Sequence, residues 1–302
     1  MYRLGLMLFV GGCTVVFVDE PPQPAETDAD SKAGTKDTST TTHYKMLSVG
    51  AKHLCALDGD KQVKCWGDDE KAVSVPALDF TYVTAGPGYS CGVTNEKVEC
   101  WGSESPGSPD HSDGIASVHG ASGFACALST GKEVTCWGPE AEAPTVKYAE
   151  SIDAGGKHAC AITRSDPDNG FQANQWACWG AEATNQFPSD ENLAFKALDV
   201  AKDHTCAISD SPATLCLPEN VQTKEEFVSI AAAPNFACGL NMNKKIKCWG
   251  VDDSDAPLVP DDEWVYVAAS ATEDWACGIA VDQASDNHKI KCWGSAMPNQ
   301  LP

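Results

Sequence analysis

Fourteen of the fifteen cysteines in this 302-residue chain fall into seven successive pairs, and this regularity constrains the fold more than any other feature. The two members of a pair lie 9 to 18 residues apart, and the pairs recur about every 37 residues. So short a repeated unit predicts a repeat architecture, such as a solenoid or a propeller, rather than one irregular domain. The pairs are Cys55–Cys65, Cys91–Cys100, Cys126–Cys136, Cys160–Cys178, Cys206–Cys216, Cys238–Cys248 and Cys277–Cys292.

Other positions of the repeat also keep their own chemistry. A small residue and then an aliphatic residue follow every first cysteine, and Trp-Gly follows every second cysteine except Cys216, which precedes Leu217-Pro218. The short segments are rich in β-branched and aromatic residues and are separated by Gly, Pro, Asp and Asn, which predicts strands and turns. Two residues before each first cysteine stands a ring: His53, Tyr89, Phe124, His158, His204, Phe236 and Trp275. Eleven before it, five repeats have an aromatic residue: Tyr44, Phe80, Phe195, Phe227 and Tyr266.

The spacing within a pair predicts a disulfide across a hairpin. In CGVTNEKVEC, a two-residue turn at Asn95-Glu96 places Cys91 opposite Cys100. Opposed residues of antiparallel strands have Cα atoms about 4.5 to 5.5 Å apart, within the range of a disulfide. We therefore expect seven disulfides inside the repeats. The alternative use of the thiols is zinc binding, but the chain has no Cys-x-x-Cys pair; we expect no metal and no cofactor.

Repeats of three or four short antiparallel strands must protect their open edges, and a radial arrangement does so. The sequence therefore predicts an all-β fold, a seven-bladed β-propeller over residues 43–302. Little chain follows the last Trp-Gly at Gly294. We expect the N-terminal strand near residues 44–49 to close the ring.

The N-terminus has the features of an export signal. Arg3 is followed by an apolar run from Leu4 to Val10 and by Gly11-Gly12-Cys13. This resembles a bacterial lipoprotein signal, with residues 1–12 removed and Cys13 acylated; an ordinary cleaved signal peptide is the alternative. The run is shorter than the roughly 20 residues that cross a bilayer. Residues 13–42 are poor in aliphatic side chains beyond Val18 and are expected to form a disordered tether.

Charge and cysteine content narrow the partners and the compartment. The net charge of −22 argues against nucleic acid and against anionic lipid, both of which need a basic protein surface. Fifteen cysteines favour an oxidising compartment. We expect an exported monomer at the bacterial outer membrane or cell surface, or on the periplasmic side, that touches the membrane only through its lipid.

Two stretches of the first repeat carry a family resemblance. Residues 50–57 (GAKHLCAL) and 63–67 (VKCWG) resemble the regulator of chromosome condensation repeat, which runs through a His-Ser/Thr-x-Ala-Leu segment to a Trp-Gly ending. Residues 185–188 (NQFP) and 299–302 (NQLP) are similar to the family's Asn-x-x-Gly-Gln-Leu ending. The likeness extends over about residues 44–302. It implies a seven-bladed β-propeller, in a disulfide-rich version that looks like exported bacterial members.

The resemblance implies interaction more than chemistry. The eukaryotic namesake of the family works on a small GTPase and on chromatin, and an acidic exported chain shares neither context. The architecture also resembles that of the type II β-lactamase inhibitory protein, a bacterial binding protein. A shared fold does not transfer a function by itself.

Three motifs could indicate chemistry, and each has a simpler interpretation. His53, His158 and His204 occupy the ring position of the repeat, so we expect packed rings whose nitrogens bond nearby backbone rather than metal ligands or bases. Residues 88–92 (GYSCG) match the G-x-S-x-G elbow of hydrolases, but they fall inside the repeat frame. Residues 166–170 (DPDNG) are similar to part of a calcium loop, but the glycine comes one position early and no closing Glu follows. The other acidic residues are expected in solvated loops without a shared frame.

The longest hairpin is the first candidate for a contact region, because long loops on rigid scaffolds often carry binding. It lies between Cys160 and Cys178, and its candidate residues are Asp166, Asp168, Asn169, Phe171 and Trp176. The insertion between Ile279 and Ile290 is the second candidate.

We expect a non-enzymatic binding protein with a protein partner. The alternatives are a carbohydrate or cell-wall binding module and a polysaccharide lyase or hydrolase that uses the central funnel. Two convergent carboxylates, or His with Tyr, at one end of the propeller axis would favour the enzyme. An exposed aromatic and acidic rim without such a cluster would favour protein binding.

Overall fold

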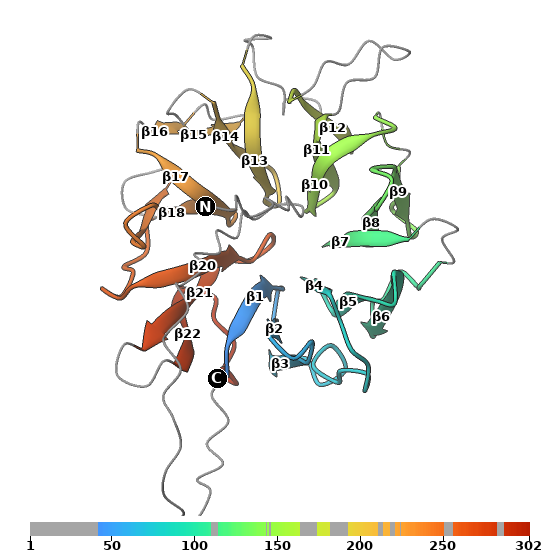
Figure 1. Cartoon of the computed structure of the whole chain (residues 1–302), viewed down its shortest axis with the longest axis horizontal. Helices are drawn as coiled ribbons and strands as arrows, with labels where there is room; N and C mark the ends of the chain where they lie inside the picture. The colour runs from blue at the N-terminus through green and yellow to red at the C-terminus, as the bar shows by residue number, and fades with distance from the viewer. Residues whose placement is uncertain are drawn as a thin grey trace, which may run out of the picture.

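Each repeat folds into one small antiparallel sheet, and the sheets stand around a common axis like blades (Figure 1). The computed structural model describes residues 42–109, 114–142, 144, 146–163, 174–181, 193–210, 214–217, 221–223, 225–250, 256–282 and 287–302. These residues form seven sheets of strands and turns, and no helix occurs among them. The predicted all-β, seven-bladed propeller is confirmed.

The first three blades each contain three strands. Blade one has β1 (Tyr44–Val49), β2 (His53–Asp58) and β3 (Val63–Gly67). Blade two has β4 (Tyr82–Gly86), β5 (Tyr89–Thr94) and β6 (Lys97–Gly102). Blade three has β7 (Ile115–Ala121), β8 (Phe124–Ser129) and β9 (Val134–Trp137).

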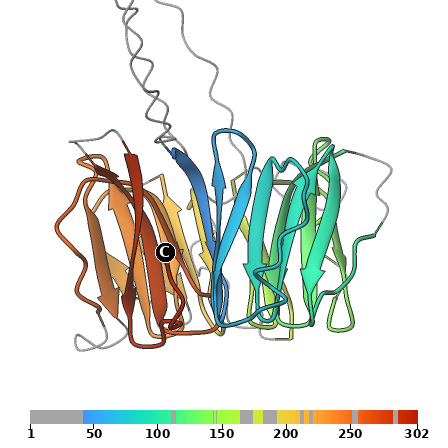
Figure 2. The same ribbon diagram turned by 90° about the horizontal axis from the view of Figure 1, so that it is seen from below.

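The fifth blade has an additional strand. Blade four has β10 (Ala149–Gly155), β11 (His158–Thr163) and β12 (Trp176–Gly180), and blade five has β13 (Phe195–Val200), β14 (Thr205–Ser209), β15 (Thr214–Leu217) and β16 (Val221–Thr223). Blade six has β17 (Phe227–Ala232), β18 (Phe236–Asn241) and β19 (Ile246–Gly250). Blade seven has β20 (Trp264–Ala269), β21 (Trp275–Asp282) and β22 (Asn287–Gly294). The first strand of every blade is the one nearest the axis (Figure 1), and the edge-on view shows the blades standing side by side (Figure 2).

β1 lies at the seam where the ring closes, but it belongs to the sheet of β2 and β3 and does not complete the last blade. Val49 forms a single parallel bridge with Ser270 of blade seven. The C-terminal tail also reaches blade one, where the Asn299 backbone N–H donates to Asp68 at 3.1 Å. The ring therefore closes by packing and a few polar contacts between neighbouring blades.

Disulfides join the second and third strand of every blade. All seven predicted pairs are bonded, at directly opposed positions with Cα atoms 4.0 to 4.1 Å apart. In blade two, Asn95 and Glu96 have φ angles of 48° and 61°, as the predicted two-residue turn requires. The first cysteine of each pair is fully buried, so one end of each disulfide lies in the hydrophobic core.

The ring that precedes the first cysteine joins neighbouring blades. His53 Nε2 lies 2.8 Å from Ser90 Oγ of the next blade, and His158 Nε2 lies 3.0 Å from Thr205 Oγ1. The expected backbone partner is replaced for His158 by the hydroxyl one position before the next blade's first cysteine, while His53 has both such a hydroxyl and a backbone hydrogen bond at Tyr89. Ser90, the serine of the G-x-S-x-G match, is fully buried with His53 and is part of this joint.

An aromatic residue at the start of the inner strand packs on the tryptophan that follows the second cysteine. The Phe227 and Trp249 rings stack with centroids 5.2 Å apart. In blade seven the partner of Trp293 is Trp264, at 5.3 Å, although Tyr266 is the residue eleven positions before the first cysteine. The turn after β20 is longer than in the other blades, so the equivalent position lies two residues earlier in the sequence. Equivalent pairs are Tyr44 with Trp66 and Phe80 with Trp101.

The small residue after the first cysteine makes room for this aromatic ring. A β-carbon added to Gly239 would lie 2.4 Å from the Phe227 ring, and one added to Gly92 would lie 2.4 Å from Phe80. Glycine therefore stands where a large ring covers the sheet closely.

Replacing Gly239 by alanine tests this packing. We expect Gly239→Ala to lower the free energy of unfolding by about 1 to 3 kcal/mol, because the ring of a packed core must move. Gly131→Ala is the matched control, since its β-carbon would meet only Ser129 Oγ at 3.5 Å. Denaturant unfolding measures both variants; equal stability of the two would contradict the packing argument.

The buried histidines predict a loss of stability in acid. Burial lowers the pKa of His53 and of His158 from 6.5 to about 4. The unfolded chain therefore takes up these protons first as the pH falls. The contribution of each histidine to stability declines between pH 6.5 and about 4, by about 3 kcal/mol, and is constant below that range.

A double variant isolates one of these joints. His53→Phe with Ser90→Ala copies the Phe124 and Ala159 pair that packs between blades three and four. We expect it to fold and to show a shallower loss of stability between about pH 6.5 and about pH 4 in denaturant unfolding. An unchanged pH profile would assign the acid sensitivity to other groups.

Candidate functional site

The candidate site is the axis of the propeller, where one position of each inner strand faces the centre. This position pairs with the first cysteine of its blade, so the same register places it in all seven blades. Its occupants change from polar to apolar around the ring: Ser48, Thr84, His119, Asp153, Asp199, Ala231 and Ala268.

Four of these polar side chains accept a backbone N–H from the inner strand of the next blade. An inner strand pairs on only one side within its own sheet, so some of its N–H groups would otherwise lack a partner. The four contacts are Ala85 N to Ser48 Oγ at 2.8 Å, Gly120 N to Thr84 Oγ1 at 3.2 Å, Val200 N to Asp153 Oδ2 at 2.7 Å, and Ala232 N to Asp199 Oδ2 at 2.7 Å.

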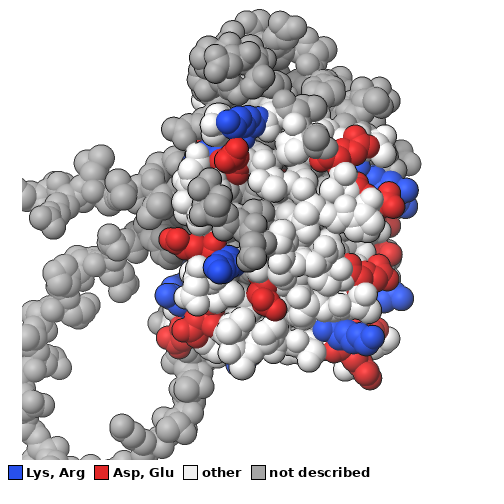
Figure 3. All heavy atoms as spheres, turned by 90° about the vertical axis from the view of Figure 1, so that its right-hand side faces the viewer, with Lys and Arg blue, Asp and Glu red and all other residues white. Residues whose placement is uncertain are grey.

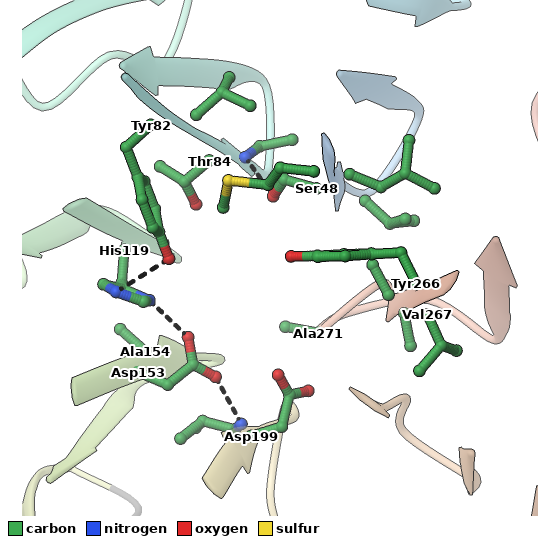
Figure 4. A pocket seen from close by; sticks show the side chains of 18 residues that line it. Ser48, Tyr82, Thr84, His119, Asp153, Ala154, Asp199, Tyr266, Val267 and Ala271 are labelled. Atoms are coloured by element: carbon green, nitrogen blue, oxygen red, sulfur yellow. Dashed lines mark hydrogen bonds and ion pairs between the residues drawn. The ribbon is translucent and has the colours of Figure 1, made fainter. Parts of the chain in front are cut away.

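His119 connects the hydroxyl and carboxylate parts of this series. Its Nδ1 lies 2.9 Å from Asp153 Oδ1, and its Nε2 lies 3.2 Å from both the Tyr82 hydroxyl and Ser117 Oγ (Figure 4). With a proton on Nδ1, His119 donates to the carboxylate and accepts a hydrogen bond at Nε2. Both oxygens of Asp153 are therefore engaged, one by His119 and one by the Val200 N–H.

These side chains surround a small axial cavity of about 80 Å³. One wall is polar and includes Tyr82, His119, Asp153 and Asp199, while the opposite wall is formed by alanines and the ring of Tyr266 (Figure 4). None of the described residues that line the cavity is Lys or Arg. The space suits a few water molecules and is too small for a polysaccharide.

The Asp199 carboxyl has an unusual environment. Burial raises its pKa well above the ordinary range, and the neighbouring Asp153 carboxylate raises it further. The hydrogen bond from the Ala232 N–H acts in the opposite direction but is the smaller effect. Two carboxyls that share an enclosed space hold one proton between them more readily than two charges.

The axial acids were missed by the sequence analysis, although a signal for them exists. Asp153 and Asp199 both stand seven residues before the first cysteine of their repeat. The expectation that acidic residues share no repeat frame is therefore wrong for these two. The signal is weak because the other blades have Ser, Thr, His or Ala at the aligned position.

The predicted contact loop lies mostly outside the described residues. The predicted residues outside the described part of the chain are Asp166, Asp168, Asn169, Phe171 and Cys13. Trp176 is described, and its assignment to a contact surface is wrong: only 5% of the residue is exposed. Its ring packs edge-on against Phe195 at 5.4 Å, because Cys216 of blade five is followed by leucine and Phe195 has no tryptophan of its own blade to cover.

Among the described residues, no group of three or more His, Cys, Asp or Glu side chains is placed to hold a metal ion. The part of the chain that the structure describes also contains no helix with the length and apolarity of a membrane span.

Comparison with known proteins supports the repeat and the fold. The family model of the regulator of chromosome condensation (RCC1) repeat matches residues 47–71. The ectodomain of the Physcomitrella patens receptor kinase CR4 is 22% identical, with a TM-score of 0.70 over 84% of this chain and 74% of that one. The ectodomain of the Arabidopsis thaliana receptor kinase ACR4 is 20% identical, with a TM-score of 0.68 over 86% of this chain and 98% of that one.

Yeast RCC1 (Prp20), in a structure in which Kap60 is bound to it, is 14% identical, with a TM-score of 0.57 over 80% of this chain and 82% of that one. At these identities the likeness establishes the fold and not the activity. The chain is thus a seven-bladed β-propeller that contains a repeat of the RCC1 type.

Proposed function

We propose that this protein is an exported, lipid-anchored and non-enzymatic binding protein of the RCC1-repeat family, whose propeller docks a protein partner. The observation that carries the proposal is the use of the cysteines. The seven disulfides take up every cysteine of the repeats and leave Cys13 alone, directly after a short apolar run and two glycines. Such a set of disulfides persists in an oxidising compartment.

The repeated residues supply a frame rather than reacting groups. The first cysteine of each pair, the rings and the small residues of the repeat are buried and used in packing. The axial carboxylates accept backbone N–H groups of neighbouring blades. Recognition then belongs to the loops that differ between blades, of which the Cys160–Cys178 hairpin is the longest. The receptor-kinase ectodomains and the Kap60-bound yeast RCC1 support a binding role for this architecture.

The surface charge fits a neutral or basic protein partner. Lysines and acidic residues alternate on the side of the ring that Figure 3 shows, with no continuous basic area on that face. The whole chain has a net charge of −22, which disfavours nucleic acid and anionic lipid headgroups.

One observation favours a second function. The axis gathers two carboxyls with His119 and Tyr82, the combination that would favour a polysaccharide lyase or hydrolase. The cavity of about 80 Å³ and the structural use of both Asp153 oxygens argue against this alternative. Turnover of a polysaccharide by the protein, abolished by Tyr82→Phe in a folded variant, would establish the enzyme in place of the binding protein.

The lipid anchor has a direct test. We expect the wild-type chain, expressed in a bacterial host, to partition with membranes and to yield a lipid-modified N-terminal peptide that begins at Cys13. Cys13→Ala should abolish both, and Ser31→Ala in the tether is the control that should retain both. Mass spectrometry of the N-terminal peptide decides; an unmodified wild-type peptide from a membrane-free protein refutes the anchor.

The contact loop is tested by capture with defined variants. Phe171→Ala and Asp168→Ala should each weaken binding of a partner identified by crosslinking to the wild type, by about tenfold for a central contact residue. Asp60→Ala, in the corresponding short hairpin of blade one, should leave binding unchanged. Equal binding by all four proteins, measured by surface plasmon resonance, would remove the loop from the interface.

A further inference from the structure

The polar contacts along the axis link each inner strand to the next in chain order, and Asp199 is the last polar side chain in this series. Each contact runs from an inner strand to the next one in chain order, from Ser48 through Thr84, His119 and Asp153 to Asp199. The next two positions are Ala231 and Ala268, which have no polar atom to continue the series. Asp199 is therefore the last member of this series.

The ionised carboxylate of Asp199 would have no free counter-charge among the described residues of the cavity. The Asp153 carboxylate is paired with His119 at 2.9 Å, and its second oxygen accepts the Val200 N–H. Asp199 lines the same cavity, and its described neighbours there offer it a backbone N–H but no lysine or arginine. A half-buried carboxylate beside a second carboxylate and without a counter-charge is costly, so neutralisation by a proton is favoured.

The titratable groups around Asp199 come from four other blades. Asp153 on β10 faces it directly, His119 on β7 stands behind Asp153, and the phenols of Tyr82 on β4 and Tyr266 on β20 lie across the cavity (Figure 4). Blade six contributes the Ala232 N–H, and blade one contributes the hydroxyl of Ser48. The only group in this set that can be cationic is His119, which is already paired with Asp153.

We propose that the axial cavity is a proton-controlled joint, in which one proton shared by Asp199 and Asp153 holds blades four, five and six together and its loss loosens them. With the proton present, neutral Asp199 donates to Asp153 while its other oxygen accepts the Ala232 N–H. Without it, two carboxylates face each other across the contact between β10 and β13. The joint is then strained at the end of the series, beside the two blades that have only alanine there.

The direction of the pH effect follows from linkage. The pKa of Asp199 is raised in the folded protein, so the folded state holds a proton that the unfolded chain releases at lower pH. Stability from this group is present in acid and is lost as the pH rises through the folded pKa. This loss begins near pH 3.8, where the unfolded chain ionises, so it overlaps the range between pH 6.5 and about 4 in which the buried histidines act in the opposite sense. A variant that keeps both histidines and changes only Asp199 separates the two effects.

Asp199→Asn is the decisive variant, because an asparagine keeps an oxygen for the Ala232 N–H and an N–H for Asp153 but cannot ionise. Both proteins keep the buried histidines, so they are compared at each pH. We expect the apparent melting temperature of the wild type to fall relative to that of the asparagine variant as the pH rises from about 4 through the folded pKa of Asp199. At the alkaline end the variant should melt about 2 to 4 °C or more above the wild type. Asp60→Asn, at an exposed turn, is the control and should follow the wild type.

Asp199→Ala separates the proton from the blade contact. It copies the alanines of blades six and seven, so it should remove the pH slope but melt below Asp199→Asn at every pH. A pH dependence that is the same in the wild type and in Asp199→Asn would assign the effect to another group and overturn the proposal.

Infrared difference spectroscopy detects the proton itself. We expect a carbonyl stretching band of a protonated carboxylic acid in the wild type at neutral pH, absent in Asp199→Asn and retained in Asp60→Asn. A wild type that shows no protonated carboxyl at neutral pH would overturn the proposal whatever the melting temperatures are.

Discussion

The hydrogen-bonding need of the inner strands governs how the blades assemble. A small three-stranded sheet needs a packed hydrophobic face to be stable, and the inner strand has N–H and C=O groups on its axial edge that its own sheet does not pair. The axial side chains of blades one, two, four and five each accept one backbone N–H of the blade that follows. The blades therefore satisfy some of one another's backbone hydrogen bonds at the axis, where no further described strand pairs with the inner strands.

The disulfides act at the other level, inside each blade. They join the second and third strands at opposed positions and leave the inner strand attached by backbone bonds alone. The first cysteine is fully buried in every blade. In blades one and four its sulfur also contacts a hydroxyl of the next blade, so this side chain stabilises both its own blade and the contact between the two blades. Covalent bonds hold the outer two strands, and non-covalent contacts position the inner one.

Much of this arrangement could be predicted because it repeats. The ring position, the small residue and the paired cysteines have one role in every blade, so seven copies identify that role even when each copy is weak. Trp176 and Trp264 show the limit of this reasoning. The first fills the place of a tryptophan that blade five lacks, and the second replaces Tyr266 because a longer turn shifts the register. Both depend on contacts between segments whose lengths differ, and a fixed count along the sequence cannot follow them.

The axial position was hidden for a related physical reason. Serine, threonine and aspartate differ in size and charge, but each offers an oxygen to an N–H, which is the property that the axial positions of blades one, two, four and five share. Because this contact needs only one acceptor oxygen, the residue type can vary from blade to blade without loss of the fold. A carboxylate satisfies the N–H as well as a hydroxyl does but adds a charge, and two such charges in one cavity make the joint sensitive to protons. Placing both acids on adjacent blades, with alanines beyond them, concentrates that sensitivity in one part of the ring while the disulfide-linked outer strands stay fixed.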